Sequence, residues 1–566
     1  MRGLRAIVWA AALAVASSEA LADWQVWTVT DTRRVLRDEP AGKGTEVVLA
    51  AARNEGRGFQ ILMRSDEAVK GINIQPGDLK GPGDAAIAAK DARLYRQHQL
   101  EIKQGTHRND AFEPGWYPDP LIPFRHPVTG EPLKGARFAA VPFDLPANET
   151  HGFWVDVAVP ARTPPGQYRG VCRVTAEGQR PVEIPVVLHV WDFELPSTPT
   201  LVTSFGSPAG ALRGYYRRRA KEGKDKEPED WAAVETQCSL MLSEHRFNAY
   251  PPSGSLAPVA KPDGTFDIPA EQVAAFREFV DRYHVNAFCT PHPSSAGVKD
   301  PKAEKPKLHA WLRAWDKAAA ELDRPVLFYT YLKDEPNKEE EYRYVQTWGK
   351  AVREAKSVVK VMVVEQTKTQ DEKWGDLYGA VDIWCPLFSL HDPDTAAQRQ
   401  ALGEQIWTYT ALCQLKPTPW WHIDFPLLHY RVPAWMAWRY RMTGLLYWGG
   451  MSFWNQVEDP WTDAWTYGHP KEKDKKGLVY NGEGTLVYPA RAVGYEGIVP
   501  SLRLKALRDS IEDYEYFALA AKLGLADKAQ EIVLSVAPSF FEWDKDPASY
   551  DKARAKLAEL IVAARK

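Results

Sequence analysis

The sequence predicts a protein of several domains: an N-terminal β-sandwich, then a (β/α)8 barrel of the TIM type, with a helical C-terminal segment. Up to about residue 196, short runs of alternating apolar and polar residues are separated by turn residues. After residue 200, candidate strands alternate with amphipathic stretches, which is typical of a βα barrel. We therefore expect a sandwich over residues 23–196 and a barrel with its C-terminal helices over residues 197–566.

The first 22 residues have the features of a secretory signal. Arg2 and Arg5 precede an apolar stretch from Ala6 to Ala16, and Ala20-Leu21-Ala22 offers a small-x-small cleavage pattern. The stretch is too short to span a membrane. We expect an exported protein, periplasmic or secreted, with no membrane insertion once residues 1–22 are removed.

The sandwich strands alternate with a period of two residues, so that every second side chain can enter a core. Pro164-Pro165-Gly166 separates two of them, and this is turn chemistry because Pro fixes φ while Gly permits positive φ. Residues 196–199, Pro-Ser-Thr-Pro, form the expected linker. The clearest strands are residues 46–49, 58–63, 153–157, 168–174 and 184–190.

The barrel is predicted from eight candidate strands with amphipathic stretches such as Val273–Tyr283 and Glu340–Ala355 between them. After Ser501, Leu504, Leu507 and Ile511 begin an apolar series at helical spacing. The candidate strands are Leu201–Phe205, Phe247–Tyr250, Ala287–Thr290, Val326–Leu332, Val359–Val364, Val381–Trp384, Gln405–Thr410 and Gly444–Trp448.

Composition excludes several classes of function. The 71 Lys and Arg residues nearly balance 74 Asp and Glu residues, so nothing favours a nucleic-acid or anionic-membrane partner. The five cysteines have no metal-binding spacing, and their odd number argues against a disulfide framework. The sequence has no phosphate-binding loop, dinucleotide fingerprint, GxSxG elbow or HExxH motif.

Two acids, Asp334 and Glu335, follow the fourth candidate barrel strand and precede Pro336. This order places both carboxylates at the C-terminal mouth of the barrel, where barrel enzymes carry their active sites. Neighbouring residues of a regular strand point to opposite faces, so both acids can face a ligand only if the strand bends. The alternative is a helix N-cap, with residues 337–340 beginning the next helix.

Aromatic residues are dense between residues 384 and 465, which suits a carbohydrate cleft because aromatic faces stack on the C–H faces of sugars. Packing in the core is the alternative, and it is the better interpretation for Trp435 and Trp438. For His422 the sequence favours a structural role at least as much as a role in binding the sugar. The cleft candidates are Trp384, Tyr447, Trp448 and Trp454, with His422, Asp424 and Asn455 as hydrogen-bonding partners for hydroxyl groups.

A series of motifs, in this order along the chain, resembles glycoside hydrolase family 123 and related proteins that share its catalytic domain. The series covers most of the chain after residue 50 and is more specific than any one motif. The motifs are Ala51–Glu55, Phe59-Gln60, Pro165–Gly170, His245–Asn248, Lys333–Pro336, Val381–Trp384, Gly444–Trp448, Gly482–Pro489 and Arg503–Tyr516. The helical spacing of the last favours a structural role, with Glu512 and Asp513 paired to basic residues.

The resemblance implies a β-sandwich followed by a (β/α)8 barrel and a retaining exo-β-N-acetylgalactosaminidase. Such an enzyme would act on a glycan and require neither a metal nor an organic cofactor. It implies that Glu335 protonates the glycosidic oxygen and then activates water. Asp334 would orient the 2-acetamido group of the substrate, whose carbonyl oxygen attacks the anomeric carbon. A nucleophile within the substrate explains why the usual separation of two carboxylates does not apply.

Two other functions stay open at this point. One is a glycosidase of different sugar specificity on the same fold, because the motif does not distinguish galacto from gluco configuration. The other is a secreted carbohydrate-binding protein without hydrolytic activity, although a pure binder has no need for both acids. The oligomeric state is not predicted.

Overall fold

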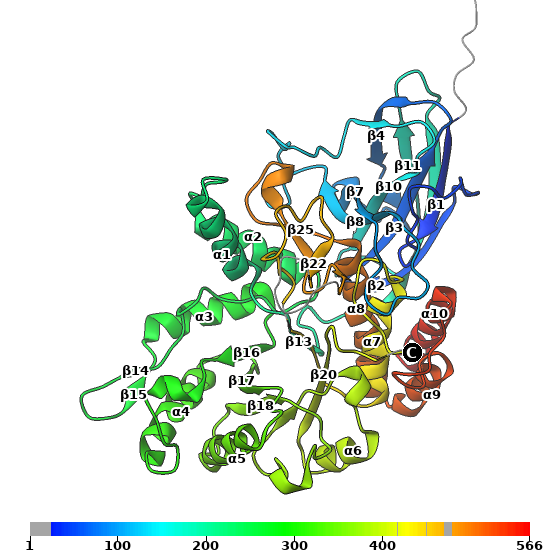
Figure 1. The fold of residues 1–566 in the computed structure, drawn as a ribbon. Coiled ribbons are helices and arrows are strands. Elements are labelled where there is room, and N and C mark those ends of the chain that lie inside the picture. The colour runs from blue at the N-terminus through cyan, green and yellow to red at the C-terminus, as the bar shows by residue number, and fades with distance from the viewer. Residues whose placement is uncertain (1–23, 416, 449, 469–477, 566) are drawn as a thin grey trace, which may run out of the picture.

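The computed structural model describes residues 24–415, 417–448, 450–468 and 478–565 (Figure 1). The expected signal segment, residues 1–22, lies outside the described residues. The chain folds into a sheet-rich N-terminal part, a parallel barrel and a C-terminal group of helices that lies beside both. None of the helices in the described ranges is both long and apolar enough to cross a bilayer.

The N-terminal part consists of two β-sheets around a shared core. Side chains of both sheets meet there, among them Phe59, Ile61 and Met63 from one and Tyr168 and Val174 from the other, as the alternating pattern predicted. The first sheet has the order β1 (Gln25–Thr30), β3 (Glu55–Arg64), β10 (His151–Val159), β7 (Ala92–Ile102) and β8 (Gly115–Pro123). The second has β2 (Val47–Arg53), β12 (Val182–Glu194), β11 (Gly166–Thr175), β4 (Val69–Pro76) and β9 (Phe143–Leu145), with β5 (Leu79–Lys80) and β6 (Ala86–Ile87) beside it.

The barrel has seven parallel strands in its described part and is nearly closed. Helices α3–α7 cover its outside, while α1 and α2 lie together, α1 on the side of the molecule away from the sandwich and α2 against β25 (Ile498–Pro500) (Figure 1). Its strands, in spatial order, are β13 (Val202–Ser204), β21 (Gly444–Tyr447), β20 (Gln405–Thr410), β19 (Ile383–Trp384), β18 (Lys360–Val364), β17 (Leu327–Asp334) and β16 (Ala287–Thr290). The helices are α1 (Pro208–Lys221), α2 (Trp231–Glu244), α3 (Ala270–Tyr283), α4 (Lys305–Ala320), α5 (Glu339–Glu354), α6 (Pro393–Ala401) and α7 (Leu428–Arg439).

The predicted strand Phe247–Tyr250 is wrong, because this segment fills its place in the barrel without a strand ladder. Asn248 donates from its backbone to Thr203 Oγ1 at 2.8 Å and accepts at Oδ1 from the Asn286 backbone at 3.0 Å. The Asn248 side-chain amide also donates to the Thr203 carbonyl at 3.1 Å, so one side chain joins β13 to the residue that precedes β16. Two prolines, residues 251 and 252, follow and lack the N–H groups that a ladder requires.

The C-terminal helices α8 (Leu502–Lys522), α9 (Ala526–Val536) and α10 (Pro547–Ala564) pack against the sandwich and the barrel. Helix α8 is buried almost throughout, including its charged residues. Asp513 accepts from Arg431 Nε at 2.8 Å, and Lys505 Nζ donates to Asp156 of β10 at 2.7 Å. These ion pairs confirm the structural role expected for the acidic motif.

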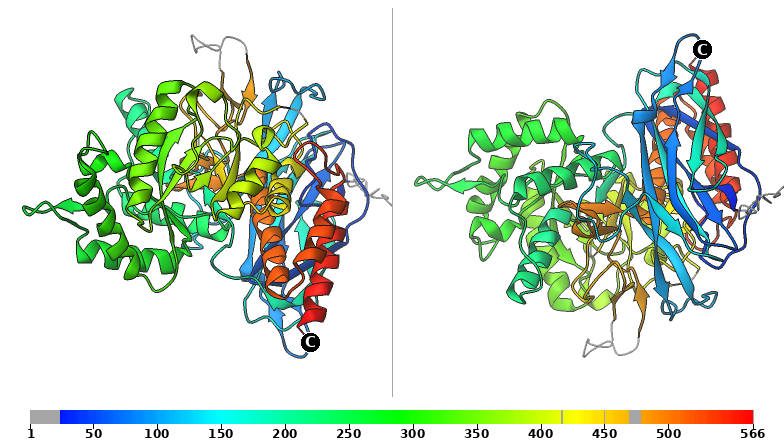
Figure 2. Two further views of the ribbon diagram at one scale, coloured as in Figure 1. Left: turned by 90° about the horizontal axis from the view of Figure 1, so that it is seen from below. Right: turned by 90° about the horizontal axis from the view of Figure 1, so that it is seen from above.

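Short hairpins complete the fold. The hairpin of β14 (Val259–Ala260) and β15 (Phe266–Asp267) projects away from the barrel in both views of Figure 2. The remaining strand pairs lie between the barrel and the sandwich (Figure 1). They are β22 (Trp465–Tyr467) with β23 (Tyr480–Asn481) and β24 (Val487–Pro489) with β25 (Ile498–Pro500).

Candidate active site

The acid pair lies at the end of β17, where the strand is irregular. Tyr331 pairs with Met362 and Lys333 with Val363, so β17 has one residue more than β18 over this stretch. Glu335 then adopts a positive φ of 37° while its backbone N–H still donates to the Val364 carbonyl at 3.1 Å. The strand therefore bends at the point where a regular strand would separate the two carboxylates.

Each carboxylate of the pair accepts a hydrogen bond from a different tyrosine inside the barrel. Tyr331 donates to Asp334 Oδ1 at 2.7 Å, and Tyr409 donates to Glu335 Oε1. Both tyrosines belong to the apolar cluster inside the barrel, whereas Asp334 and Glu335 are exposed. Burial and the adjacent carboxylate both raise the pKa of each tyrosine, so each hydroxyl stays a donor.

The helix-cap alternative for the acid pair is wrong. Helix α5 begins at Glu339 after Lys338, and its N-cap makes no side-chain hydrogen bond. The Asn337 backbone N–H is satisfied instead by Glu341 Oε2, at 2.9 Å. The two acids are therefore not needed to begin the helix.

A third carboxyl group, Glu365, follows β18 directly and is 5% exposed. The Gln370 amide donates to both of its oxygens at 2.9 Å and also reaches the Pro336 carbonyl at 3.3 Å. Burial raises the pKa of Glu365 to about 7, and the charge of Glu335 contributes to the rise. Gln370 thus joins Glu365 to the turn that follows the acid pair.

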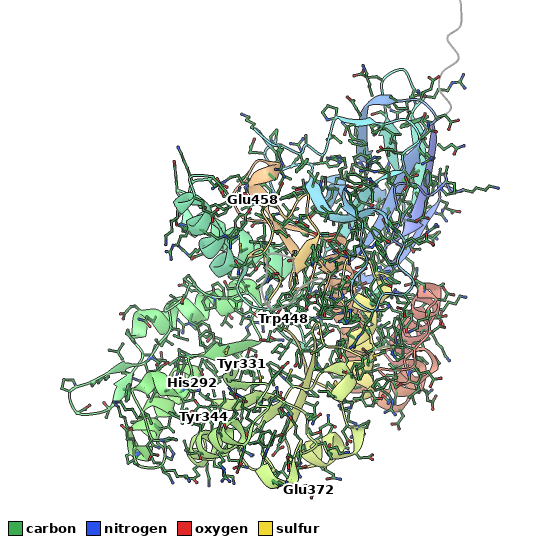
Figure 3. The ribbon with its side chains drawn as sticks, viewed as in Figure 1. His292, Tyr331, Tyr344, Glu372, Trp448 and Glu458 are labelled. Atoms are coloured by element: carbon green, nitrogen blue, oxygen red, sulfur yellow. The ribbon has the colours of Figure 1, made fainter. Side chains whose placement is uncertain are left out.

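A second acidic centre is formed by Glu483 and by residues that follow the barrel strands β20 and β21. Glu483 is 1% exposed, accepts from the indole N–H of Trp448, and lies with Oε2 2.7 Å from His422 Nε2. The Trp448 ring is half-buried, and Tyr447 accepts at its hydroxyl from the Gly484 backbone at 2.8 Å. Figure 3 shows Tyr331 and Trp448 in the central part of the molecule, between the sandwich and the outer helices.

The second acidic centre lies close to the acid pair, and the thiol of Cys413 is affected by carboxylates of both. Burial raises the pKa of this thiol, and the carboxylates of Glu335 and Glu483 both raise it further. Trp448 packs against the same apolar cluster inside the barrel as Tyr331 and Tyr409, so the two centres lie at one mouth.

The structure thus brings five of the predicted residues together at one mouth of the barrel: Asp334, Glu335, His422, Asp424 and Trp448. His422 is fully buried with Nε2 against Glu483, so its predicted contact with sugar hydroxyl groups is replaced by a structural role. Tyr447 is 2% exposed and packs outside the barrel wall, so its assignment to the cleft is corrected.

Three other residues predicted to line the cleft lie away from the mouth, so their assignment as sugar-binding residues is corrected. Trp384 is 1% exposed, packs outside the barrel wall and donates to Glu404 at 2.7 Å, because in the two-residue strand β19 Ile383 takes the inward position. Trp454 is also 1% exposed and donates to the Val487 carbonyl at 3.0 Å. Asn455 is exposed and accepts from Arg218 of α1 at 2.9 Å.

Asp424 is at the mouth, but protein donors already occupy its carboxylate. It accepts from the Thr106 backbone at 2.7 Å and the Thr106 hydroxyl at 2.6 Å, and Asn109 donates to it at 3.0 Å. Both donors come from the sandwich, on the loop of residues 103–114 between β7 and β8, named here the β7–β8 loop. The predicted role of Asp424 in binding hydroxyl groups is therefore replaced by the anchoring of this loop.

Sequence reasoning missed Tyr331, Tyr409, Glu483 and Glu365. Only Glu483 had a local signal, because it stands between Gly482 and Gly484. Both glycines have a positive φ, 75° and 67°, and a Cβ at Gly484 would lie 2.8 Å from the Phe453 Cβ. The pair of glycines lets the backbone turn so closely that Glu483 meets the indole of Trp448.

Other features of the described residues do not compete with this site. A cavity of about 1430 Å³ lies between the sandwich and α8, and its lining contains neither acid of the pair. Within the described ranges no group of three or more His, Cys, Asp or Glu side chains is arranged to hold a metal ion. The chemistry that the mouth offers is acid–base chemistry by carboxyl groups beside an aromatic surface.

Comparison with known families gives matches over both parts of the chain. Residues 311–520 match the family model of the glycoside hydrolase 123 catalytic domain, and residues 27–176 match that of the glycoside hydrolase 123 N-terminal domain. No functionally curated protein sequence matches the chain.

Among solved structures, a family 123 glycoside hydrolase from Clostridium perfringens, described for glycolipid glycan hydrolysis, is similar over 96% of this chain and 98% of its own. The TM-score is 0.65 at 13% sequence identity, which indicates a shared fold. A family 39 glycoside hydrolase from Bacteroides cellulosilyticus covers 84% of this chain and 82% of its own at 11% identity, with a TM-score of only 0.29.

Proposed function

Because the chain belongs to glycoside hydrolase family 123, we propose that it is an exported, retaining exo-glycosidase that releases β-linked N-acetylgalactosamine by substrate-assisted catalysis. The observation that carries the proposal is the bend in β17. It directs two adjacent carboxylates into the barrel mouth and gives each its own tyrosine donor. Two acids in different environments can take different roles in one reaction.

In the first step, Glu335 donates its proton to the glycosidic oxygen as the bond from that oxygen to the anomeric carbon breaks. The carbonyl oxygen of the substrate's 2-acetamido group forms the new bond to the anomeric carbon. Asp334, held by Tyr331, accepts from the acetamido N–H and stabilises the positive charge that develops on this group. The aglycone leaves with the proton from Glu335.

In the second step, Glu335 removes a proton from water, and the water oxygen attacks the anomeric carbon. The bond to the acetamido oxygen breaks, so the product is N-acetylgalactosamine with its original β configuration. Tyr409 donates to Glu335 while this carboxylate is ionised between the two steps.

The Trp448 ring supplies a flat apolar surface at the mouth, where the C–H face of a sugar ring can stack. Glu483 holds the orientation of this ring through the indole N–H. His422 in turn lies against Glu483, which gives this buried carboxylate a second partner.

The experiment that tests the proposal measures hydrolysis of three p-nitrophenyl glycosides: β-N-acetylgalactosaminide, its gluco epimer and plain β-galactoside. We expect turnover of the acetamido galactoside alone. Glu335→Gln should lower kcat/KM by about a hundredfold or more, because a general acid contributes about 10²–10⁴-fold. The loss should be larger for a disaccharide than for the aryl glycoside, since p-nitrophenolate leaves without much help from an acid.

Asp334→Asn should also lower turnover of the acetamido sugar, and an unchanged unfolding midpoint in both variants would exclude loss of the fold. Turnover of plain galactoside would contradict substrate assistance and favour a glycosidase of other specificity. Binding of sugar without turnover, unaltered by Glu335→Gln, would favour a carbohydrate-binding protein.

A further inference from the structure

The sandwich domain contributes a loop to the mouth of the barrel. The β7–β8 loop reaches the barrel and is held there by hydrogen bonds to Asp424 and to residues 479–481. Thr106 donates twice to Asp424, and its hydroxyl accepts from the Asn481 backbone at 3.1 Å. His107 donates from its backbone to the Val479 carbonyl at 2.8 Å. The loop is therefore an ordered part of the rim.

The barrel residues that hold this loop are neighbours of the second acidic centre. The His107 ring contacts Tyr480 edge to face at 6.0 Å, and Tyr480 contacts His422 at 5.8 Å between ring centroids. His422 contacts Glu483, which holds Trp448. A continuous set of contacts thus leads from the sandwich loop to the aromatic surface that is proposed to carry the sugar.

Arg108 stands at the tip of this loop. Its side chain is exposed and forms no ion pair with another described residue. The neighbouring His107 ring contacts Tyr480, so Arg108 stands beside the residues that lead to Glu483 and Trp448. Burial and Glu483 raise the pKa of the Tyr480 hydroxyl, and the Arg108 guanidinium opposes this rise.

The backbone of Arg108 gives an independent reason to examine its side chain. Its φ is 65°, in the left-handed region, and the turn is closed by the Asn109 N–H donating to the Thr106 carbonyl at 2.8 Å. Glycine adopts this conformation at less cost than any other residue. An arginine here means that the turn projects a long cationic side chain from a fixed position, at a cost in backbone energy.

The mouth itself is acidic, with Asp334, Glu335 and Glu483 around it. An anionic glycan would be repelled by these carboxylates unless a cation at the rim compensates. A guanidinium pairs with a carboxylate through two parallel hydrogen bonds, whereas neutral hydroxyl groups gain much less from it.

We propose that Arg108 is a specificity-determining residue, which binds an acidic sugar on the aglycone side of the bond that is cleaved. The inference rests on the proposed function, because it takes the acid pair as the place of cleavage. It assigns to the sandwich domain a part of the substrate site, so that the cleft consists of residues from both domains.

The test uses two β-N-acetylgalactosaminyl disaccharides that differ only at C6 of the second sugar, which is glucuronate in one and glucose in the other. Binding is measured by calorimetry on the full chain carrying Glu335→Gln, so that no hydrolysis is needed. We expect tighter binding of the glucuronate. Arg108→Ala should lower the affinity ratio of glucuronate to glucose about fivefold, as for an ion pair that stays partly in water. Lys103→Ala, an exposed cation on the same loop, should leave this ratio unchanged.

An affinity ratio that is the same with and without Arg108 would overturn the inference, and so would equal losses in Arg108→Ala and Lys103→Ala. Arg108→Ala keeps a side chain at the same left-handed position, so the turn is comparably strained in both proteins. Turnover by the unmodified chain is measured on the same disaccharides. If both bind and neither is hydrolysed, the proposed function fails while the affinity ratio still decides the role of Arg108. If neither binds, both are refuted.

Discussion

Glu365 contributes to the pH dependence of the protein's stability, and Glu365→Gln should remove that contribution. The carboxyl group is buried behind the acid pair, and its pKa in the folded protein is raised from 4.5 to about 7. The folded state therefore holds the proton more tightly than the unfolded state. As the pH rises from about 4.5 to about 7, this proton is lost from the unfolded chain first, and the free energy of unfolding falls.

The size of the effect follows from the two pKa values. One pKa unit corresponds to about 1.4 kcal/mol, so the rise costs the folded protein about 3 kcal/mol at any pH above about 7. Below about pH 4.5 the cost is absent. Glutamine has nearly the same shape and does not titrate. The free energy of unfolding of Glu365→Gln minus that of the unmodified protein should therefore be about 3 kcal/mol larger at pH 8 than at pH 4.

Urea unfolding of both proteins at pH steps from 4 to 8 measures this difference. Other buried acids, such as Glu512 with a pKa of about 7, titrate in the same window, but they are present in both proteins and cancel. Glu340→Gln, an exposed residue in the first turn of α5, is the matched control with the same change in charge. Parallel stability curves for Glu365→Gln and the unmodified protein would refute the reasoning, since they would mean that Glu365 titrates alike in both states.

Three further predictions concern single contacts. Tyr409→Phe removes the donor to the general acid and should lower kcat/KM by about tenfold to a hundredfold, as for a hydrogen bond to a charged group, whereas Tyr329→Phe elsewhere in the barrel interior should not. Asp119→Ala leaves the fully buried Arg503 without its carboxylate partner and should lower the free energy of unfolding in urea by about 3–5 kcal/mol. Asp424→Asn weakens the anchor of the β7–β8 loop, so amide hydrogen exchange in that loop should become faster while exchange in β3 stays the same; equal exchange in both proteins would contradict the anchoring role.

Much of the architecture could be predicted because its signals are local. The alternation of residues 58–63 gives the face of β3 that enters the core between the two sheets, although the opposite face is buried as well. The apolar run before Asp334 gives β17 and the place of the acids at its end. Phe247–Tyr250 is also largely apolar, yet its ladder is replaced by hydrogen bonds of the Asn248 side chain. Such a substitution depends on Thr203 and Asn286, which are remote in sequence.

The site was predicted less completely, because its geometry depends on details that a pattern of residue types does not contain. The extra residue in β17 and the positive φ of Glu335 bring the two acids together, and neither has a signature in the sequence. The direction of Trp384 depends on the phase of a strand of only two residues, which alternation cannot determine. The role of Asp424 depends on a partner more than 300 residues earlier in the chain, Thr106.

Helix α8 prevents the sandwich and the barrel from being separated as independent domains. Its buried Lys505 and Arg508 share the carboxylate of Asp156 in the sandwich, and its Asp513 binds Arg431 of the barrel and Arg554 of α10. A cut at the linker of residues 196–199 would separate Lys505 from its hydrogen-bonded anion and leave Asp156 without its two cations. Truncation and domain exchange within the family therefore have to treat sandwich, barrel and C-terminal helices as one cooperative unit. A transplanted sandwich should fold onto a foreign barrel only if it brings an acid to the position of Asp156.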